Sequence, residues 1–451
     1  NAKVYYHDIG DYLNREEKLK IVQDFKTFTK LPLKELKPNE HGDWLNQRND
    51  VFETFIPMAP EKKFDMKSQS FFTTYSNGVV SSRDAWVYNS SKKVITNNMM
   101  RMIQFYEMQR EKYGQNLDKI ENNPKEISWS VNLKRDFKKG IKHSFSEGFI
   151  SNALYRPFFK QRIYFERSFL ERPGYNDTFF PISKNENLLI GIPGLGSNKG
   201  FFPLITNSAF DFQTLMNGLI FPLYHFEERQ INNPGLFDAA GESEYIRRDG
   251  VSDFILERAK KIYGKNVSKE DIFYYVYGFL HSEDYRRTFA NDLKKMLPRL
   301  PLVDDVRDFW KFSNAGRKLA DLHLYYEDLP AYEGVELSGD SQEDFQLNPD
   351  LYKVQKMRFP KKDQKDKIIY NSKIVLSNIP EKAYEYIVNG KSAIEWIMER
   401  YQVSTDKKSG ITNDPNDWAK EQDKPRYILD LLLSIINVSV QTVDIVNDLP
   451  K

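Results

Sequence analysis

Three stretches of the sequence contain residues whose types and spacing could support chemistry, and the first could bind phosphate. Residues 191–200 read Gly-Ile-Pro-Gly-Leu-Gly-Ser-Asn-Lys-Gly. A Walker A loop needs its lysine to be followed by Ser or Thr, but here Gly200 follows Lys199. A dinucleotide-binding loop needs glycine at the position that Lys199 occupies. We therefore expect a tight turn between strands, with Lys199 available to a phosphate.

The second stretch has the residue order of a metal-dependent nuclease. Asp350 follows a proline and precedes Asp363 and Lys365, which gives the order Pro-Asp…Asp-x-Lys. Such nucleases use paired carboxylates to hold a divalent metal and a lysine near the attacking water. Because so permissive an order is common by chance in a lysine-rich chain, a self-contained nuclease is an alternative interpretation.

The third stretch contains His41 and Asp43, which could bind a metal or act as acid and base. No second group of ligands accompanies them, so a loop held by packing of Trp44 and by polar caps is the favoured interpretation. No Gly-x-Ser-x-Gly elbow supports a Ser-His-Asp triad. Cysteine is absent, which excludes disulfides, cysteine-ligated zinc, iron–sulfur clusters and a thiol nucleophile, and fits a reducing cytoplasm.

Positive charge is concentrated in two segments, although the 451 residues contain 66 Lys and Arg against 64 Asp and Glu. Residues 130–173 hold ten basic and four acidic residues with aromatic residues between them, and residues 351–373 hold eight basic and two acidic residues. Local positive charge among planar side chains suits a phosphate backbone, with arginine available for guanine edges. A solvated basic surface explains the charge equally well.

The elements that would position these residues follow from hydrophobic patterning. Strands are predicted at 3–8, 71–76, 85–88, 162–165, 188–192, 204–206, 353–359 and 367–376, and helices at 16–28, 99–113, 253–263, 282–297, 380–401 and 425–446. The last helix contains Asp430, Asn437, Gln441 and Asp444, which favours a buried helix over a membrane span. Residues 327–346 carry seven acids and no Lys or Arg, which predicts a solvated linker or long loop.

A series of further short stretches carries a family resemblance when taken together. The stretches are 8–13 (DIGDYL), 40–48 (EHGDWLNQR), 77–78 (NG), 83–88 (RDAWVY), 155–158 (YRPF), 275–282 (YVYGFLHS), 297–301 (LPRLP), 313–317 (SNAGR), 319–323 (LADLH), 394–396 (IEW) with Tyr401, and 409–414 (SGITND). In this order they resemble the C-terminal region of the Type ISP restriction–modification enzymes, which are single-polypeptide relatives of the Type I systems.

The resemblance implies a parent chain with a nuclease, a helicase-type ATPase, a coupler, an adenine-N6 methyltransferase and a target recognition domain. It implies an α+β fold, with a β-rich DNA-recognition module flanked by helical subdomains and opened by a residual methyltransferase strand. The implied domains are 1–125 (methyltransferase tail and connector), 126–326 (target recognition domain), 327–350 (acidic linker) and 351–451 (C-terminal α/β part). No Asn-Pro-Pro-Tyr/Phe loop, S-adenosylmethionine loop or Walker A loop is present in the sequence, so no complete active site is expected.

Sequence-specific recognition of duplex DNA is therefore the leading functional hypothesis, and a helical protein-interaction module is a further alternative. Expected partners are double-stranded DNA and upstream domains of the parent, with no membrane. No cofactor is expected in this chain, whereas S-adenosylmethionine, ATP and Mg are implied for the parent. The predicted DNA contacts are Gln47, Arg48, Arg83, Tyr155, Arg156, Lys160, Arg162 and Lys199.

The opening strand at 3–8 has no obvious pairing strand within about 60 residues downstream, and an unpaired strand edge is unfavourable. We therefore expect it to complete a methyltransferase sheet formed by preceding residues of the parent. The isolated chain would then be frayed at its start or prone to aggregate.

Overall fold

The computed structural model describes residues 3–10, 13–45, 47–181, 186–229, 245–340, 348 and 350–451. The chain forms two compact units, Asn1–Thr54 and Phe55–Lys451, called here the small unit and the large unit. The domain boundaries predicted after residues 125, 326 and 350 all lie within the large unit and stay predictions. Residues 341–347 and 349 of the predicted acidic linker lie outside the described residues.

The small unit is built around a two-stranded antiparallel sheet. Strand β1 (Val4–Tyr6) pairs with β2 (Lys34–Leu36), with Val4 opposite Leu36. The expectation that the opening strand has no partner within about 60 residues downstream is therefore wrong, whereas its part in a sheet formed by preceding residues stays a prediction. Strand β2 escaped detection because three residues are too few to show an alternating pattern. Helices α1 (Arg15–Asp24) and α2 (Asp50–Thr54) complete the unit, and α1 begins with a capping box between Asn14 and Glu17.

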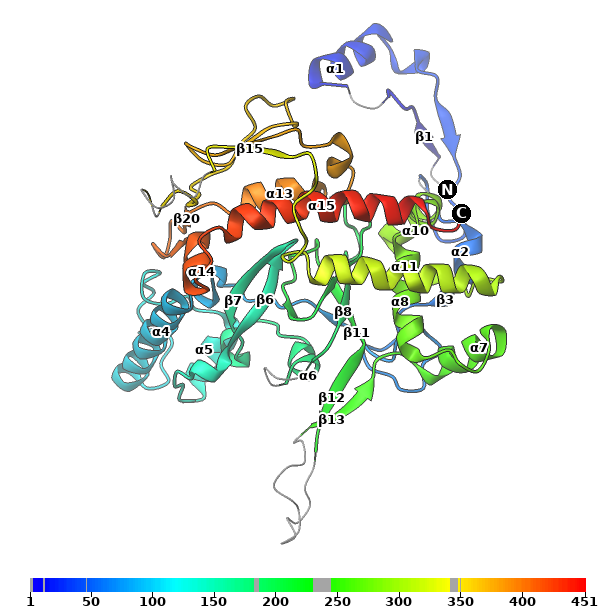
Figure 1. The fold of residues 1–451 in the computed structure, drawn as a ribbon. Coiled ribbons are helices and arrows are strands. Elements are labelled where there is room, and N and C mark those ends of the chain that lie inside the picture. Colours follow the sequence, from blue (N-terminus) through cyan, green and yellow to red (C-terminus); the bar gives the residue numbers. More distant parts are fainter. Residues whose placement is uncertain are drawn as a thin grey trace. The chain divides into compact units, whose positions relative to one another are not determined.

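Two four-stranded sheets lie at the centre of the large unit (Figure 1), with strand orders β10-β6-β7-β5 and β4-β11-β8-β9. Their strands are β4 (Ser76–Asn77), β5 (Tyr88–Asn89), β6 (Ile150–Arg156), β7 (Phe159–Tyr164), β8 (Leu189–Ile192), β9 (Leu204–Thr206), β10 (Ala209–Phe210) and β11 (Leu219–Pro222). The glycine-rich stretch at 191–200 joins the antiparallel pair β8 and β9, which confirms the predicted turn between strands.

Smaller sheets surround this centre. They are β3 (Ile56–Pro57) with β14 (Arg299–Leu300), β12 (Tyr224–Glu228) with β13 (Tyr245–Asp249), β15 (Glu336–Ser338) and β16 (Ile368–Ile369) with β17 (Val375–Ser377), β18 (Ile387–Val388) with β19 (Lys391–Ser392), and β20 (Ser404–Thr405) with β21 (Thr412–Asn413).

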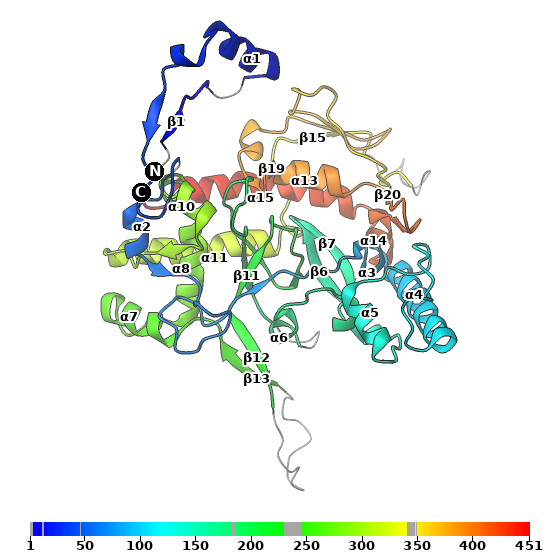
Figure 2. The same cartoon turned by 180° about the vertical axis from the view of Figure 1, so that it is seen from behind.

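The helices of the large unit pack around the sheets. They are α3 (Asp84–Val87), α4 (Lys92–Tyr113), α5 (Val131–Lys138), α6 (Asn176–Phe179), α7 (Asp253–Tyr263), α8 (Lys269–Leu280), α9 (Glu283–Thr288), α10 (Ala290–Lys295), α11 (Val306–Leu324), α13 (Ala393–Arg400), α14 (Pro415–Glu421) and α15 (Tyr427–Asn447). Figure 2 shows α13 and α15 side by side across the ends of β6 and β7.

Helix α15 is the main core helix of the large unit. It belongs to the largest hydrophobic cluster, which also contains Leu154 of β6, Leu189 of β8 and Leu204 of β9. By length and composition α15 could cross a membrane, but 72% of its apolar window is buried inside the fold. The prediction of a buried helix is thus confirmed.

Two glycines allow α8 and α11 to cross in backbone contact. A Cβ atom on Gly316 would lie 1.9 Å from the carbonyl oxygen of Tyr274, and one on Gly278 would lie 2.1 Å from that of Phe312. Only glycine fits at such a crossing, because real Cβ contacts are far longer. The two glycines therefore fix the spacing of this helix pair.

Several predicted elements differ from the structure. Residues 85–87 belong to helix α3 and only Tyr88 belongs to a strand, β5, because four residues are too few for the apolar pattern to separate a helical turn from a strand. The helix predicted at 282–297 is two helices that meet at Phe289. In the segment 380–401, only Glu381–Tyr384 and Ala393–Arg400 are helical, and no strand forms at 353–359.

The described part of the predicted acidic linker, residues 327–340, is tied to the rest of the large unit near its two ends. Glu327 accepts hydrogen bonds from Lys160 and Tyr427, and Asp340 forms an ion pair with Arg426. A count of charges could not show this, because the basic partners lie far away in sequence. Residues 328, 330, 331, 333, 334, 336, 338 and 339 are nonetheless exposed and none of residues 327–340 is buried, so this part is a solvated segment that polar contacts anchor near both of its ends.

Candidate functional site

A hollow of about 540 Å³ lies on the small β15–β17 sheet and its preceding loop, and four cations line it. These are Lys353, Lys356, Arg358 and Lys373, and we call the site the cationic hollow. The polar side chains of Gln355, Asn371, Ser372 and Asn348 and one carboxylate, that of Asp350, also line it. The site therefore combines positive charge with hydrogen-bonding groups.

The hollow is held together by the side chain of Asn371. Its Nδ2 donates to the carbonyl oxygens of Leu351 (2.7 Å) and Lys353 (3.1 Å), and its Oδ1 accepts from the backbone nitrogens of Lys373 and Ile374, both at 2.9 Å. A single amide thus ties together the two segments that carry the cations. The backbone that presents the cations is therefore fixed before any ligand binds.

The charges of the hollow are largely uncompensated. Lys353 forms an ion pair with Asp350 at 2.8 Å. Lys356, Arg358 and Lys373 are exposed and have no acidic partner among the described residues. A phosphate gains most from cations that are not already paired, and the guanidinium of Arg358 can bind phosphate through two hydrogen bonds.

A second group of free cations lies at the end of α5. Lys134, Lys138, Lys139 and Lys142 are exposed, with no ion pair in the described part of the chain. They account for part of the charge excess predicted at 130–173. Of the six other basic residues of that segment, Arg156, Lys160 and Arg162 have internal partners, whereas residues 135, 167 and 172 are exposed.

Arg156 and Tyr155, both predicted DNA contacts, belong to an internal network. The Nη1 atom of Arg156 lies 2.7 Å from Oδ1 of Asp211, and its guanidinium lies 3.9 Å from the ring centre of Tyr155. The hydroxyl of Tyr155 donates to Asp84 at 2.9 Å. Burial raises the pKa of Asp211 to about 7, against the opposing charge of Arg156.

Lys160 and Arg162, on β7, also have internal partners. Lys160 Nζ lies 2.6 Å from Oε2 of Glu327. Arg162 donates to Asn152 at 2.5 Å and stacks on Trp418 with 4.1 Å to the ring centre. A phosphate would have to compete with these partners for both side chains.

Arg83 is only 4% exposed, and its guanidinium has no hydrogen-bond partner among the described residues. Burial lowers the pKa of Arg83 to about 10. By contrast, Lys199 lies on the exposed β8–β9 loop and has no ion pair in the described chain. Of the basic residues predicted in the β-rich segment, Lys199 is thus the one best placed to meet a phosphate.

In the small unit, the loop at 40–48 is held by polar contacts around Asp43. Arg48 Nε donates to Asp43 at 2.9 Å, and Gln47 Nε2 donates to the Asp43 carbonyl at 3.2 Å. His41 Nε2 lies 3.3 Å from Glu53, whereas Trp44 is 39% exposed. The prediction that polar groups hold this loop is confirmed. The prediction that Trp44 packs to hold it is wrong, because the Trp44 side chain is exposed. The roles of Gln47 and Arg48 toward DNA stay predictions.

Two residues of the nuclease pattern, Asp350 and Lys365, form ion pairs with different partners instead of forming one site. Asp350 pairs with Lys353, and Lys365 Nζ lies 3.1 Å from Glu395. Across the described residues, no group of three or more His, Cys, Asp and Glu side chains could hold a metal ion. The structure therefore gives the nuclease alternative no support.

The free cations of the hollow were missed as individual residues, although the segment at 351–373 was recognised as basic. The sequence feature that could have identified them is the scarcity of Asp and Glu among the residues next to Lys356, Arg358 and Lys373 in the chain. Sequence alone could not show that Lys160 or Arg162 has partners more than 100 residues away.

Comparisons with known proteins identify the family to which the chain belongs. Residues 70–431 match the sequence profile described as the Type ISP C-terminal specificity domain. No curated protein matches the chain significantly.

Solved structures resemble the whole chain. A nuclease-deletion mutant of the Type ISP restriction–modification enzyme LlaGI, in complex with a DNA substrate mimic, is 38% identical, with 100% of this chain and 33% of that chain covered and a TM-score of 0.84. The ATP-dependent Type ISP enzyme LlaBIII bound to DNA is 35% identical, with coverages of 100% and 28% and a TM-score of 0.86.

A cryo-electron microscopy structure of a DrdV–DNA complex is 24% identical, with coverages of 100% and 43% and a TM-score of 0.81, and shows a shared fold. This chain thus spans about a third of the length of the LlaGI and LlaBIII chains that it matches.

Proposed function

Because this chain belongs to the Type ISP family of restriction–modification enzymes and contains its C-terminal specificity domain, we propose that it recognises a short sequence in duplex DNA. The observation that carries the proposal is the cationic hollow, whose free cations Lys356, Arg358 and Lys373 stand beside the exposed amide side chain of Gln355. Cations supply affinity for the phosphate backbone, and amide or guanidinium groups can read base edges in the major groove.

The similarity to LlaGI and LlaBIII supports this proposal, since both were solved with DNA. In the parent enzyme the domain would hold the target adenine against the methyltransferase and couple site recognition to ATP-dependent translocation and cleavage. S-adenosylmethionine, ATP and Mg would then be cofactors of upstream domains, and those domains would be partners of this chain in a cytoplasmic enzyme.

The test is DNA binding by the 451-residue chain as a function of salt. The variant carries Lys356→Ala, Arg358→Ala and Lys373→Ala together. A matched control removes the same charge from exposed cations that are already paired, through Lys112→Ala, Arg307→Ala and Lys311→Ala. Each lost phosphate contact should lower the slope of log K against log salt by about one unit.

We expect the hollow variant to bind duplex DNA more weakly and with a smaller salt slope, and the control to behave as wild type. Equal affinity and slope for the two variants would remove the hollow from the interface. Salt-insensitive binding, or no binding, would favour the protein-interaction alternative. Magnesium-dependent cleavage by the chain alone would instead revive the nuclease alternative.

A further inference from the structure

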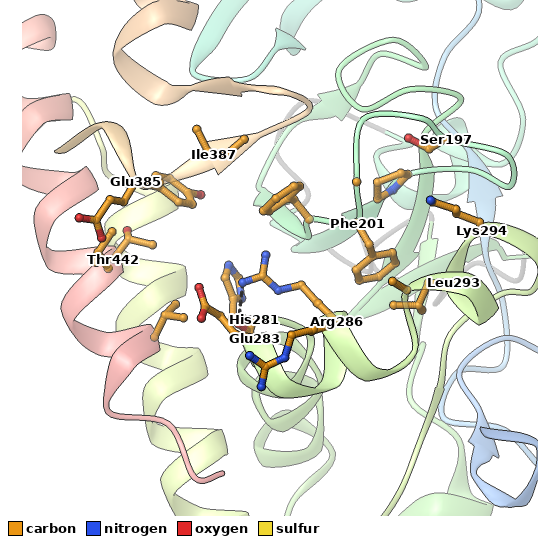
Figure 3. Close-up of a pocket in the computed structure, with 18 of the residues that line it drawn as sticks. Ser197, Phe201, His281, Glu283, Arg286, Leu293, Lys294, Glu385, Ile387 and Thr442 are labelled. Atoms are coloured by element: carbon orange, nitrogen blue, oxygen red, sulfur yellow. Dashed lines mark hydrogen bonds between the residues drawn. The ribbon is translucent and has the colours of Figure 1, made fainter. Parts of the chain in front are cut away.

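A second cavity of about 560 Å³ lies apart from the cationic hollow, in the large unit (Figure 3). Its walls come from the β8–β9 loop, α9, α10, the segment before β18 and the second half of α15. This volume is within the range of about 300–1,000 Å³ that is usual for small-molecule sites. We call it the α15 pocket.

Two buried polar side chains of the α15 pocket lack partners. His281 is 3% exposed and Tyr386 is 6% exposed, and both line the cavity. His281 Nε2 and the Tyr386 hydroxyl are shielded from solvent, and neither has a hydrogen-bond partner in the described part of the chain. Since a buried polar atom without a partner costs about 1–3 kcal/mol, such atoms at a cavity point to a ligand.

The hydrogen-bonding roles of these two groups can be assigned. His281 Nδ1 lies 2.8 Å from the carbonyl oxygen of Tyr277, which can only accept, so Nδ1 carries the proton. Burial lowers the pKa of His281 to about 3, so the ring is neutral and Nε2 is an acceptor. Burial raises the pKa of Tyr386, which keeps its hydroxyl protonated and able to donate. The wall of the cavity thus holds one acceptor and one donor, and neighbouring atoms cover both, so a ligand reaches them only when the wall opens.

The layer behind these groups is rigid. His323 Nδ1 lies 2.5 Å from the Tyr277 hydroxyl, and its Nε2 lies 3.0 Å from Oγ1 of Thr442. The ring of Tyr386 stacks on that of His323 at 5.2 Å between centres. The Tyr386 ring is therefore held in place by this stacking, while its buried hydroxyl has no hydrogen-bond partner among the described residues.

Arg286 lies at the same cavity and forms no ion pair with a carboxylate among the described residues, although the nearby charge of Glu283 acts on it. Arg286 donates to the carbonyl oxygens of His281 (3.1 Å) and Ser282 (3.4 Å), and its guanidinium lies 4.9 Å from the ring centre of Phe202. Figure 3 shows Arg286 beside His281, with Phe201 and Lys294 across the cavity. The cavity therefore presents aromatic surface together with a site for an anion.

Negative charge at the rim of the cavity limits the number of phosphate groups that a bound ligand can carry. Glu283 and Glu385 line it and are exposed. Their negative charge would repel a polyphosphate, whereas a single phosphate could bind Arg286 without approaching both acids. The lining thus favours one anionic group attached to a planar ring with donors and acceptors.

We propose that the α15 pocket binds one nucleotide unit, with its base edge toward His281 and Tyr386 and its phosphate toward Arg286. The Watson–Crick edge of every nucleobase carries at least one donor and one acceptor, and Phe201 and Phe202 supply ring surface for stacking. The unit could be a free nucleoside monophosphate or a nucleotide extruded from DNA. Only the second source depends on the proposed DNA recognition.

The first arm of the test measures calorimetric binding of the four deoxynucleoside monophosphates to the 451-residue chain. Tyr386→Phe removes the hydroxyl alone, and His281→Phe removes the acceptor and keeps an aromatic ring. Tyr326→Phe is the matched control, because the buried Tyr326 hydroxyl also lacks a partner but does not line the cavity. Circular dichroism and thermal melting check that all variants fold.

The second arm compares a duplex that has one bulged nucleotide with the fully paired duplex. Extrusion costs less for an unpaired base, so a pocket for extruded nucleotides should favour the bulged duplex. Loss of one hydrogen bond should weaken binding about tenfold.

Two results support the proposal. Tenfold weaker mononucleotide binding in Tyr386→Phe and His281→Phe, but not in Tyr326→Phe, identifies a free nucleotide. Loss of the preference for the bulged duplex in the same two variants identifies an extruded nucleotide. If folded Tyr386→Phe and His281→Phe match wild type in both arms, the proposal is overturned. If the wild-type chain binds no duplex at all, the proposed function is contradicted. The binding of mononucleotides then decides by itself whether the α15 pocket is a nucleotide site.

Discussion

Arg156 Nη1 lies 2.7 Å from Oδ1 of Asp211, and the Asp211 side chain is almost completely buried. The ion pair joins β6 to the segment that follows β10, two neighbouring strands of one sheet. Arg156 therefore has a structural task that does not involve DNA. The same is true of Lys160 and Arg162, whose partners come from distant parts of the chain.

The Asp211 carboxyl predicts a pH-dependent stability. Its pKa is about 7 in the folded chain, above its ordinary value of 3.8. Between these values the unfolded chain has lost the proton and the folded chain keeps it, so this group's contribution to stability falls as pH rises from about 4 to 7. Asp211→Asn cannot ionise and should lack this fall. Urea unfolding of both proteins at several pH values measures it, and parallel pH profiles would contradict the prediction.

The Lys160–Glu327 pair predicts a loss of stability when it is broken. Lys160→Met leaves the Glu327 carboxylate with Tyr427 as its remaining partner. Breaking a fully buried ion pair costs about 3–5 kcal/mol of unfolding free energy. Because these two side chains keep 17% and 21% of their surface exposed, solvent screening should lower the loss to about 1–3 kcal/mol. Lys373→Met, at an exposed and unpaired site, should change the free energy of unfolding by less than about 0.5 kcal/mol. Equal effects of both substitutions would argue against a structural role for Lys160.

The crossing of α8 and α11 predicts that Gly316 tolerates no side chain. Gly316→Ala must separate the two backbones and should lower the free energy of unfolding by about 1–3 kcal/mol or more. Gly148→Ala is the control, because its Cβ would lie 3.5 Å from Ser146 Oγ as its nearest neighbour. Denaturant midpoints compare the two variants, and a Gly316→Ala midpoint like that of the control would show that the helices have room to move.

Sequence patterning predicted elements whose apolar spacing is long and regular. The stripe of Met99, Met102, Ile103 and Tyr106 is fully or almost fully buried along α4, as predicted. The helix at 253–263 coincides with α7. Very short strands such as β2 and β18 carry no periodic signal, so their existence depends on partners that the pattern does not show.

The candidate site was predictable as a segment and not as a set of side chains. The excess of basic residues at 351–373 indicated where the cationic hollow lies. Whether a given cation is free depends on tertiary pairing, as with Lys160 and Glu327, which are separated by 167 residues. The free acceptor of His281 likewise depends on the tautomer fixed by Tyr277, which composition cannot reveal.

The hydrogen bond from the Ser90 backbone nitrogen to Asn413 Oδ1 spans 323 residues. At a synthesis rate of about 5–20 residues per second, Asn413 leaves the ribosome roughly 15–60 seconds after Ser90. During this interval the early strands of the large unit are already made, while α15, which shares their core, does not yet exist. The nascent chain must therefore hold apolar surface in water for many seconds, and its yield in the cell should depend on chaperones that bind such surfaces.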